Sequence, residues 1–315
     1  MVKTILIRLA VGLVTIWAIS AFTFMGMEAL PGDAAQAALG RDATPQALTN
    51  LRIEFGLDRP ILERYGDWIG GVVQGDLGRS IPSADPVTKV IGDKARNTGA
   101  LIVAVILVLA PLSVVLGIAS ANRRDQPLDH AVSSSTLALI STPEFVTGTL
   151  LAVVLAVWLR WLPPLSIIDA RQPIFGQMNL LLLPVLTLLA ASVAQTTRMI
   201  RACMIDVLRS EYVEMARLKG VPEMRLLLRH ALPNALGPTI QVIAINVAWL
   251  AGGVVVTETV FQFPGIGSAL TKAVAGRDLP TVEALVLLAT ALYVAVNLLA
   301  DIVVTVLNPR LRRSA

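Results

Sequence analysis

The chain has 315 residues, of which 55% are apolar and 15% are charged, and its formal net charge is +4. Soluble domains rarely have so apolar a composition, whereas polytopic membrane proteins commonly do. Cys203 is the one cysteine and His130 and His230 are the two histidines. This usage excludes an intrachain disulfide and disfavours a metal site built from several cysteine and histidine ligands, so we expect no metal.

Six apolar stretches are long enough to cross a membrane, which takes about 20 helical residues. The first has an apolar core longer than the corresponding region of a signal peptide, so we expect it to be a membrane anchor. The expected spans are Ile7–Leu30, Gly99–Ala121, Ala131–Trp158, Leu180–Ile200, Thr239–Phe261 and Val282–Leu307. The sequence therefore predicts an all-α integral membrane protein with three parts: an N-terminal transmembrane helix (1–30), an extracytoplasmic helical segment (31–98) and a five-helix core (99–315).

The segment between the first two spans has the pattern of a small helical cap. Thr44-Pro45 is typical of a helix start, and Gly56 stands where the helix would end. A second helix is predicted to open at Pro60, because apolar residues then recur at three- and four-residue spacing. Gly75 and Gly78 are expected to end it.

Polar side chains within spans are costly, and they usually face a cavity or another helix. Glu144 lies near the middle of the third span, directly after Pro143, which is expected to kink the helix. One hypothesis places Glu144 on a translocation pathway, where it would select cationic groups such as a peptide amino terminus. The alternative is a glutamate that joins two helices. The same two interpretations stay open for Gln195, Gln241 and Asn246.

The loop between the fourth and fifth spans, about residues 201–238, contains a short polar helix in its pattern. Ser210 is a favourable N-cap residue, and Gly220 supplies the left-handed residue that ends a helix. Ala216 and Gly220 lie four residues apart, so two small side chains share one face and would let a partner protein approach closely. An alternative on charge alone is an amphipathic helix that lies on anionic lipid.

The distribution of lysine and arginine predicts the orientation of the spans. With the N-terminus in the cytoplasm, the inner segments hold fourteen basic residues, of which seven lie between Arg198 and Arg229. The short outer loops hold four: Arg160, Arg171, Lys272 and Arg277. We therefore expect both termini and the polar loop to face the cytoplasm.

Several motifs spread along the chain resemble one protein family. The helix from Glu211 to Gly220, with Leu232-Pro233 downstream, resembles the EAA loop in permease subunits of bacterial ATP-binding cassette importers. The outer segment resembles that of the first permease in dipeptide, oligopeptide and nickel importers, through Leu57-Asp-Arg-Pro60 and Gly75-Asp-Leu-Gly-Arg-Ser80. The resemblance extends to Glu258-Thr-Val-Phe-Gln-Phe-Pro-Gly-Ile-Gly267 and to Asn308-Pro-Arg310, where the family pattern has aspartate in place of Asn308.

The resemblance implies a type I importer permease fold in which the EAA-like loop forms a coupling helix that lies in a cleft of the ATPase subunit. The residues assigned to this contact are Glu211, Tyr212, Glu214, Met215, Ala216, Arg217, Lys219 and Gly220. The implied partners are a second permease, two cassette ATPases and an extracytoplasmic solute-binding protein, in the inner membrane of a bacterium. ATP and magnesium would bind the ATPases, and this chain is expected to bind no cofactor and no nucleic acid.

The cargo implied by the resemblance is a dipeptide or oligopeptide, with nickel or another small solute as the alternative. The sequence has no Gly-x-x-x-x-Gly-Lys-Ser/Thr phosphate loop and no Ser-His-Asp or Cys-His set, so we expect no catalytic residues. A stand-alone secondary transporter is a competing hypothesis, but the two halves of the chain show no internal repeat. A membrane receptor or scaffold is a third, and the segment after the sixth span is too short for a signalling domain.

Overall fold

The structure is a computed structural model that describes residues 2–40, 44–169 and 172–307. The motif Asn308-Pro-Arg310 and Arg171 lie outside the described residues. The side chains of some helical residues are also outside the description: residues 2–5, 175, 236–238, 241, 244, 247–249, 251–253, 300, 301 and 303–307.

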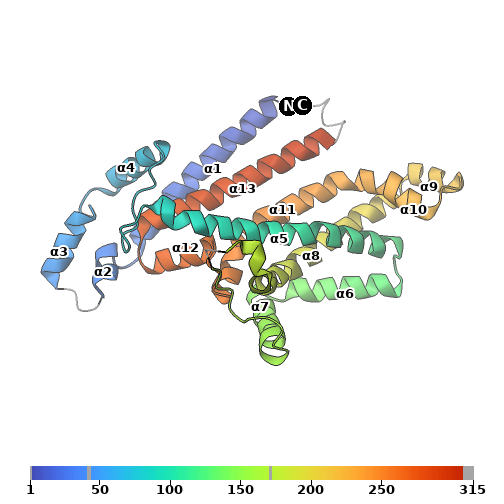
Figure 1. The fold of residues 1–315 in the computed structure, drawn as a ribbon. Helices are drawn as coiled ribbons and strands as arrows, with labels where there is room; N and C mark the ends of the chain where they lie inside the picture. Colours follow the sequence, from blue (N-terminus) through green and yellow to red (C-terminus); the bar gives the residue numbers. More distant parts are fainter. Residues whose placement is uncertain (1, 41–43, 170–171, 308–315) are drawn as a thin grey trace. The chain divides into compact units, whose positions relative to one another are not determined.

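The described part is helical apart from connecting segments and one isolated β-bridge between Arg79 and Pro86 (Figure 1). The α-helices are α1 (Val2–Ala29), α2 (Ala34–Leu39), α3 (Pro45–Glu54), α4 (Ile61–Val73), α5 (Val87–Asn122), α6 (Pro127–Ser141), α7 (Glu144–Ala152), α8 (Met178–Leu208), α9 (Glu211–Leu218), α10 (Glu223–Arg225), α11 (Leu232–Val260), α12 (Ile266–Ala275) and α13 (Leu279–Leu307). The described part also contains two π-helical segments, Val153–Trp158 and Leu226–Ala231, and a 3-10 turn, Ile174–Gln177.

The chain forms two compact units. The core unit comprises Met1–Arg8, Ala100–Phe263 and Ala295–Ala315, and the cap unit comprises Leu9–Gly99 and Pro264–Val294. Three of the boundaries between the units therefore fall within the helices α1, α5 and α13, and the fourth, between Phe263 and Pro264, falls in the connection between α11 and α12.

Four helices in the described part are long and apolar enough to cross a membrane: Leu6–Ala29, Val87–Asn122, Met178–Leu208 and Leu279–Leu299. A fifth span results if the bent pair α6 and α7 is taken as one crossing. The remaining expected span, Thr239–Phe261, falls on α11, where many side chains are outside the description. The second span differs from its expected bounds, because its helix begins twelve residues earlier, at Val87.

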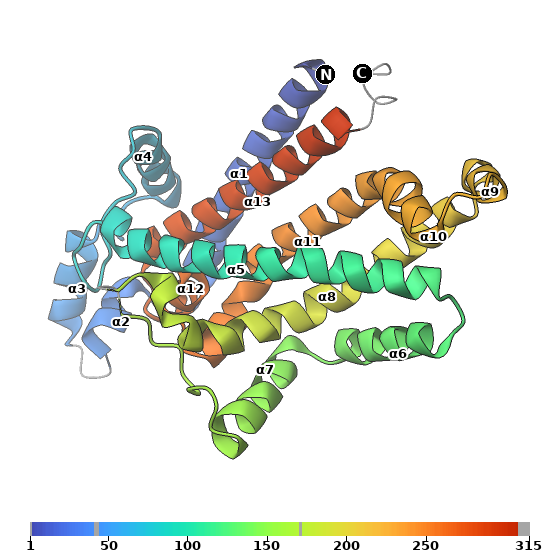
Figure 2. The same ribbon diagram turned by 45° about the vertical axis from the view of Figure 1, so that its right-hand side comes forward.

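The third expected span, Ala131–Trp158, is not one straight helix. Its two parts meet at an angle of 103° after Ser141, and Figure 2 shows α7 turning away from α6. The kink expected at Pro143 is present, because this residue has no N–H to continue a helix and its own backbone is extended (φ −56°, ψ 141°). Glu144 is consequently the first residue of α7 and does not lie in the middle of a continuous span.

The core unit is built around α8, which packs chiefly against α6, α7 and α11 (Figure 1). Buried aliphatic residues of α5, α8 and α11 form its main hydrophobic cluster, together with Phe263. Gly117 allows α5 to approach α8 closely, since a Cβ atom there would lie 2.7 Å from Cγ2 of Ile200. Burial of these apolar surfaces stabilises the unit by about 25 cal/mol per Å².

The cap unit contains the two outer helices that the sequence predicts. Thr44 accepts a hydrogen bond of 3.3 Å from the N–H of Ala47 and so caps α3, and Gly56 after the helix has a φ of +63°. The helix α4 begins after Pro60, as expected. Asp278, just before α13, accepts hydrogen bonds from the hydroxyl of Ser80 (2.6 Å) and the N–H of Ile81 (3.0 Å). These bonds hold the end of the motif Gly75–Ser80 against the rest of the cap unit.

Candidate functional site

The helix α9 is the short helix expected between the fourth and fifth spans. It begins after Ser210, whose extended backbone (φ −72°, ψ 145°) is that of an N-cap residue. The expected side-chain cap is absent, because the hydroxyl of Ser210 donates to the carbonyl of Val207. Glu211 and Glu214 lie in the first turn, where negative charge complements the helix dipole.

The C-terminal end of α9 is a Schellman motif. The N–H of Val221 donates to the carbonyl of Ala216 (3.2 Å), and the N–H of Gly220 donates to the carbonyl of Arg217 (2.9 Å). The φ of Gly220 is +75°, so the predicted left-handed end of the helix is confirmed. A Cβ atom at this position would meet no atom within 4 Å. The requirement for glycine therefore comes from the backbone conformation and not from crowding.

One face of α9 is anchored in the core unit. Val213 is fully buried, and burial of a valine side chain stabilises a fold by about 1.5–3 kcal/mol. The helix packs against α8 and against the π-helical segment Leu226–Ala231, which leads into α11. A buried cluster joins this segment to the C-terminal ends of α5 and α8, through Ala121, Ile200, Met204, Leu227, Ala231 and Ala235. Any displacement of α9 would therefore act on α8 and α11.

The opposite face of α9 is exposed. Of the eight residues that the resemblance assigns to the ATPase contact, Ala216 is half-buried, and the other seven are exposed. Leu218, which the sequence reasoning did not assign, is 76% exposed. It continues a strip begun by Tyr212 and Met215, and this three-residue spacing is the signal that could have identified it. We call these nine residues the coupling surface: Glu211, Tyr212, Glu214, Met215, Ala216, Arg217, Leu218, Lys219 and Gly220.

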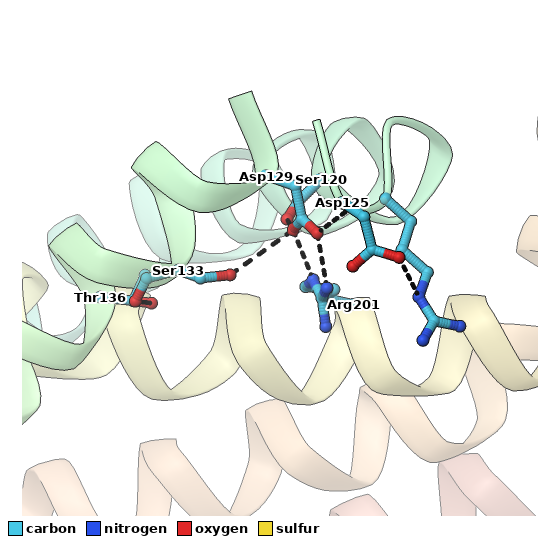
Figure 3. A network of polar contacts seen from close by, with 7 residues as sticks. Ser120, Asp125, Asp129, Ser133, Thr136 and Arg201 are labelled. Carbon is cyan, nitrogen blue, oxygen red and sulfur yellow. Dashed lines mark hydrogen bonds and ion pairs between the residues drawn. The ribbon is translucent and has the colours of Figure 1, made fainter. Parts of the chain in front are cut away.

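A network of polar contacts joins α5, α6 and α8 in the core unit (Figure 3). Its centre is the carboxylate of Asp129, which is 2% exposed. Nε and Nη2 of Arg201 each donate to it at 2.6 Å, in the two-pronged geometry that makes arginine–carboxylate pairs strong. The hydroxyl of Ser120 and the N–H of Asp125 (2.9 Å) donate to the same carboxylate.

The sequence reasoning did not identify this network. Asp129 stands at the beginning of the third expected span and Arg201 at the end of the fourth. A weak signal was present, because opposite charges at two span ends that the topology places on the same side of the membrane are candidates for pairing. Arg201 is ten residues before Glu211, so the network lies on the helix that leads directly into α9.

Glu144 bonds to a neighbouring helix. Its carboxylate accepts a hydrogen bond from the hydroxyl of Thr257 on α11, and its side chain is half-buried. The contact ties the first turn of α7 to α11, within the core unit. Gly148, one turn further along α7, lies close to Thr187 and Phe261, so α7 also approaches α8 here.

The other polar residues singled out in the spans lie in different surroundings. Asn246 is 2% exposed and donates to the hydroxyl of Thr196 on α8 (3.1 Å) and to the carbonyl of Val242 (3.0 Å). Gln195 is an exposed residue of α8. Gln241 belongs to α11, and its side chain lies outside the described residues.

Among the residues that the structure describes, no group of three or more His, Cys, Asp or Glu side chains is placed to hold a metal ion.

Comparison with known families gives matches along nearly the whole chain. Residues 113–313 match the family described as binding-protein-dependent transport system inner membrane component, and residues 1–116 match the N-terminal region of such membrane components.

Individual relatives are similar over nearly their full length. A putative peptide transport system permease protein of Brucella abortus (strain 2308) is 33% identical over 312 residues, which cover 99% of each chain. A probable peptide ABC transporter permease protein of Sinorhizobium fredii is 33% identical, with 99% of this chain and 97% of the relative covered. A glutathione transport system permease protein of Escherichia coli O6:H1 is 34% identical over 307 residues, with 97% and 98% covered.

Proposed function

The chain belongs to the family of binding-protein-dependent transport system inner membrane components, and from this premise we propose that its transported solute is a peptide. It is a permease subunit of an ABC transporter, a multi-pass inner membrane component without a catalytic role of its own. The relatives named as peptide and glutathione permeases support the choice of cargo. Nickel or another small solute is the alternative within the same class of importer.

The proposed complex contains a second permease, two cassette ATPases that bind ATP and magnesium, and an extracytoplasmic solute-binding protein. The chain crosses the membrane six times, with α11 as the fifth span and both termini in the cytoplasm. The excess of lysine and arginine in the segments assigned to the inner side supports this orientation. α9 then faces the compartment in which ATP is available.

The coupling surface is the part of this chain that would contact an ATPase. The observation that carries this assignment is the structure of α9: one face is fixed by Val213, and the other exposes Tyr212, Met215 and Leu218. An exposed apolar strip beside charged residues is typical of a protein contact. Movement of the ATPase would displace α9 and, through its packing, α8 and α11, which provides alternating access by rigid-body motion of helices.

We place Glu144, Gln195 and Gln241 on the translocation pathway of the assembled importer, whereas the burial of Asn246 and its bond to Thr196 of α8 favour the alternative for that residue, a link between two helices. Glu144 supports this best, because only one of its carboxylate oxygens is engaged by Thr257, and the side chain is half-buried. A carboxylate in that position can attract the amino terminus of a peptide.

The test is mass spectrometry of the complex purified gently from membranes through a tag on this chain, followed by peptide uptake in vesicles. Recovery of a second permease, two ATPases and a solute-binding protein, with ATP-dependent uptake of peptides, is the expected result. Nickel uptake without peptide uptake would show that the proposal of a peptide as the transported solute is wrong. Recovery of this chain alone, as a monomer or homo-oligomer that transports without ATP, would favour a secondary transporter.

A further inference from the structure

A pocket of about 180 Å³ lies in the core unit, lined by residues of α8, α9 and α10 and by the end of α5. Three arginines line it: Arg124 follows α5, Arg209 follows α8, and Arg217 belongs to α9. The one acidic lining residue is Glu223 of α10. The pocket lining therefore carries more positive than negative charge.

The three guanidinium groups keep hydrogen-bond donors available for a ligand. Arg209 is exposed and has neither an ion pair nor a side-chain hydrogen bond within the described part of the chain. Arg217 is bonded to Glu223 at 3.0 Å, and Nε of Arg124 lies 3.3 Å from Oδ2 of Asp125. Each guanidinium carries five N–H donors, so a single carboxylate contact leaves most of them free. A cluster of arginines with free donors favours phosphate over a neutral ligand, because guanidinium N–H groups form charge-assisted hydrogen bonds with phosphate oxygen atoms.

The position of the pocket indicates which phosphate is available to it. α5 and α8 are both long and apolar enough to cross a membrane, and the pocket lies at the C-terminal end of each. The end of a span is the level at which lipid headgroups lie. Ile205 and Leu208 give the same pocket an apolar side, which suits the part of a lipid next to its headgroup. Basic pockets between spans on the cytoplasmic side are known to bind anionic headgroups.

We propose that this pocket binds the phosphate of an anionic phospholipid headgroup, held by Arg124, Arg209 and Arg217. The inference rests on the proposed function in one respect, the assignment of this end of α5 and α8 to the cytoplasmic leaflet. The bound phosphate links α9, through Arg217, to the ends of α5 and α8. Binding of an anionic lipid then stabilises the position of the coupling surface relative to α5 and α8.

The competing explanation is that the arginines only stabilise the C-terminal ends of the helices and bind no ligand. A cation near a helix C-terminus interacts favourably with the last carbonyl groups, and both Arg124 and Arg209 are so placed. This explanation requires no lipid, and it predicts that removal of Arg209 leaves lipid binding unchanged.

The test is native mass spectrometry of the full-length chain, with the subunits that co-purify, in nanodiscs of phosphatidylcholine to which phosphatidylglycerol is added. The wild-type subunit is expected to retain phosphatidylglycerol in preference to phosphatidylcholine. Arg209→Gln should weaken this binding at least about tenfold, because it removes a charge-assisted contact. Arg225→Gln is the matched control: it removes the same charge from exposed α10, outside the pocket lining, and should bind as the wild type does.

Three results would overturn the inference. The first is equal retention of lipid by the wild type and Arg209→Gln. The second is equal loss in Arg209→Gln and Arg225→Gln, which would show a general effect of charge. The third is displacement of phosphatidylglycerol by excess inorganic phosphate, which would make the ligand a free anion and not a lipid. The same spectra report the subunit composition, so a missing ATPase, which counts against the proposed function, is seen separately from a missing lipid.

Discussion

Asp129 and Arg201 are 72 residues apart in the chain, and their side chains meet in two parallel hydrogen bonds of 2.6 Å. The pair joins the beginning of α6 to α8 (Figure 3), and the hydroxyl of Ser120 adds α5 to the same carboxylate. Three helices are thereby fixed to one another near the point where α8 leads into α9. We therefore expect the connection between α5 and α6 to move together with α8 when α9 is displaced.

Asp129→Asn should destabilise the protein by about 3 kcal/mol, the low end of the cost of breaking a buried ion pair, because it leaves the guanidinium of Arg201, which is 26% exposed, without its charged partner. The shape of the side chain is retained, so the loss reports the charge. The measurement is the free energy of unfolding of the solubilised protein in a denaturing detergent. ATP-dependent uptake should fall further than ATP hydrolysis, since the ion pair also joins the helices that α9 moves.

Asp125→Asn is the control for this substitution. Asp125 lies in the same connection, but its side chain is 75% exposed, and its ion pair among the described residues is with Arg124, at 3.3 Å. Its contact with Asp129 uses the backbone N–H, which the substitution keeps. An exposed pair contributes about 0–1 kcal/mol, so stability should change little. Equal losses in Asp129→Asn and Asp125→Asn would contradict the role given to the buried pair.

Gly117→Ala should destabilise the core unit, because the new Cβ atom would come within 2.7 Å of Cγ2 of Ile200 and 3.2 Å of the carbonyl oxygen of Thr197. Overpacking of this kind costs about 1–3 kcal/mol. Gly99→Ala on the same helix is the matched control, since a Cβ atom there meets nothing within 4 Å. Thermal unfolding of the two variants checks the prediction. A melting temperature for Gly99→Ala that is as low as that of Gly117→Ala, or lower, would refute it.

Gly220→Asp should separate ATP hydrolysis from uptake. An aspartate in the left-handed conformation costs about 1–2 kcal/mol, and its charge is unfavourable at a helix C-terminus. No neighbour lies within 4 Å of the new Cβ atom, so the chain should still insert and fold. Uptake by vesicles is expected to fall by about tenfold while hydrolysis continues. Gly220→Asn, which tolerates the left-handed conformation, should lose less, and normal uptake by Gly220→Asp would remove the support for the coupling surface.

Features of the fold that depend on residues close to one another in the sequence could be predicted from the sequence. Thr44 and Pro45 indicated the start of α3, and Gly220 indicated the end of α9, because caps and left-handed glycines act within a few residues. The long apolar runs likewise indicated spans, since the length of a crossing is set by the membrane.

Features that depend on tertiary contacts could not be predicted. The pairing of Asp129 with Arg201 requires the positions of α6 and α8, which no local pattern contains. Proline at position 143 indicated a kink but not its size, because the angle of 103° depends on how α6 and α7 each pack against α8. Ser210 was predicted as a cap from its residue type, yet its hydroxyl donates to the carbonyl of Val207. The residue type does not decide between these two hydrogen bonds, because a serine hydroxyl can reach either backbone group.

Glu144→Gln tests the role of Glu144 in transport. The amide can still accept a hydrogen bond from Thr257, so the link between α7 and α11 is kept while the negative charge is removed. If the carboxylate attracts the amino terminus of a peptide, uptake of peptides with a free amino group should fall by about tenfold, the effect of losing roughly 1.4 kcal/mol. Uptake of the same peptides with an acetylated amino terminus should be unchanged, because they carry no charge for Glu144 to recognise.

Thr257→Val provides the matched comparison, because it removes the hydroxyl from the same contact and leaves the carboxylate in place. We expect it to lower stability by about 1 kcal/mol, since a buried hydrogen bond is lost, and to affect free and acetylated peptides equally. Uptake and melting temperature, measured for both variants, separate the two roles. If Glu144→Gln also reduces the uptake of both kinds of peptide equally, Glu144 joins helices and does not select cargo.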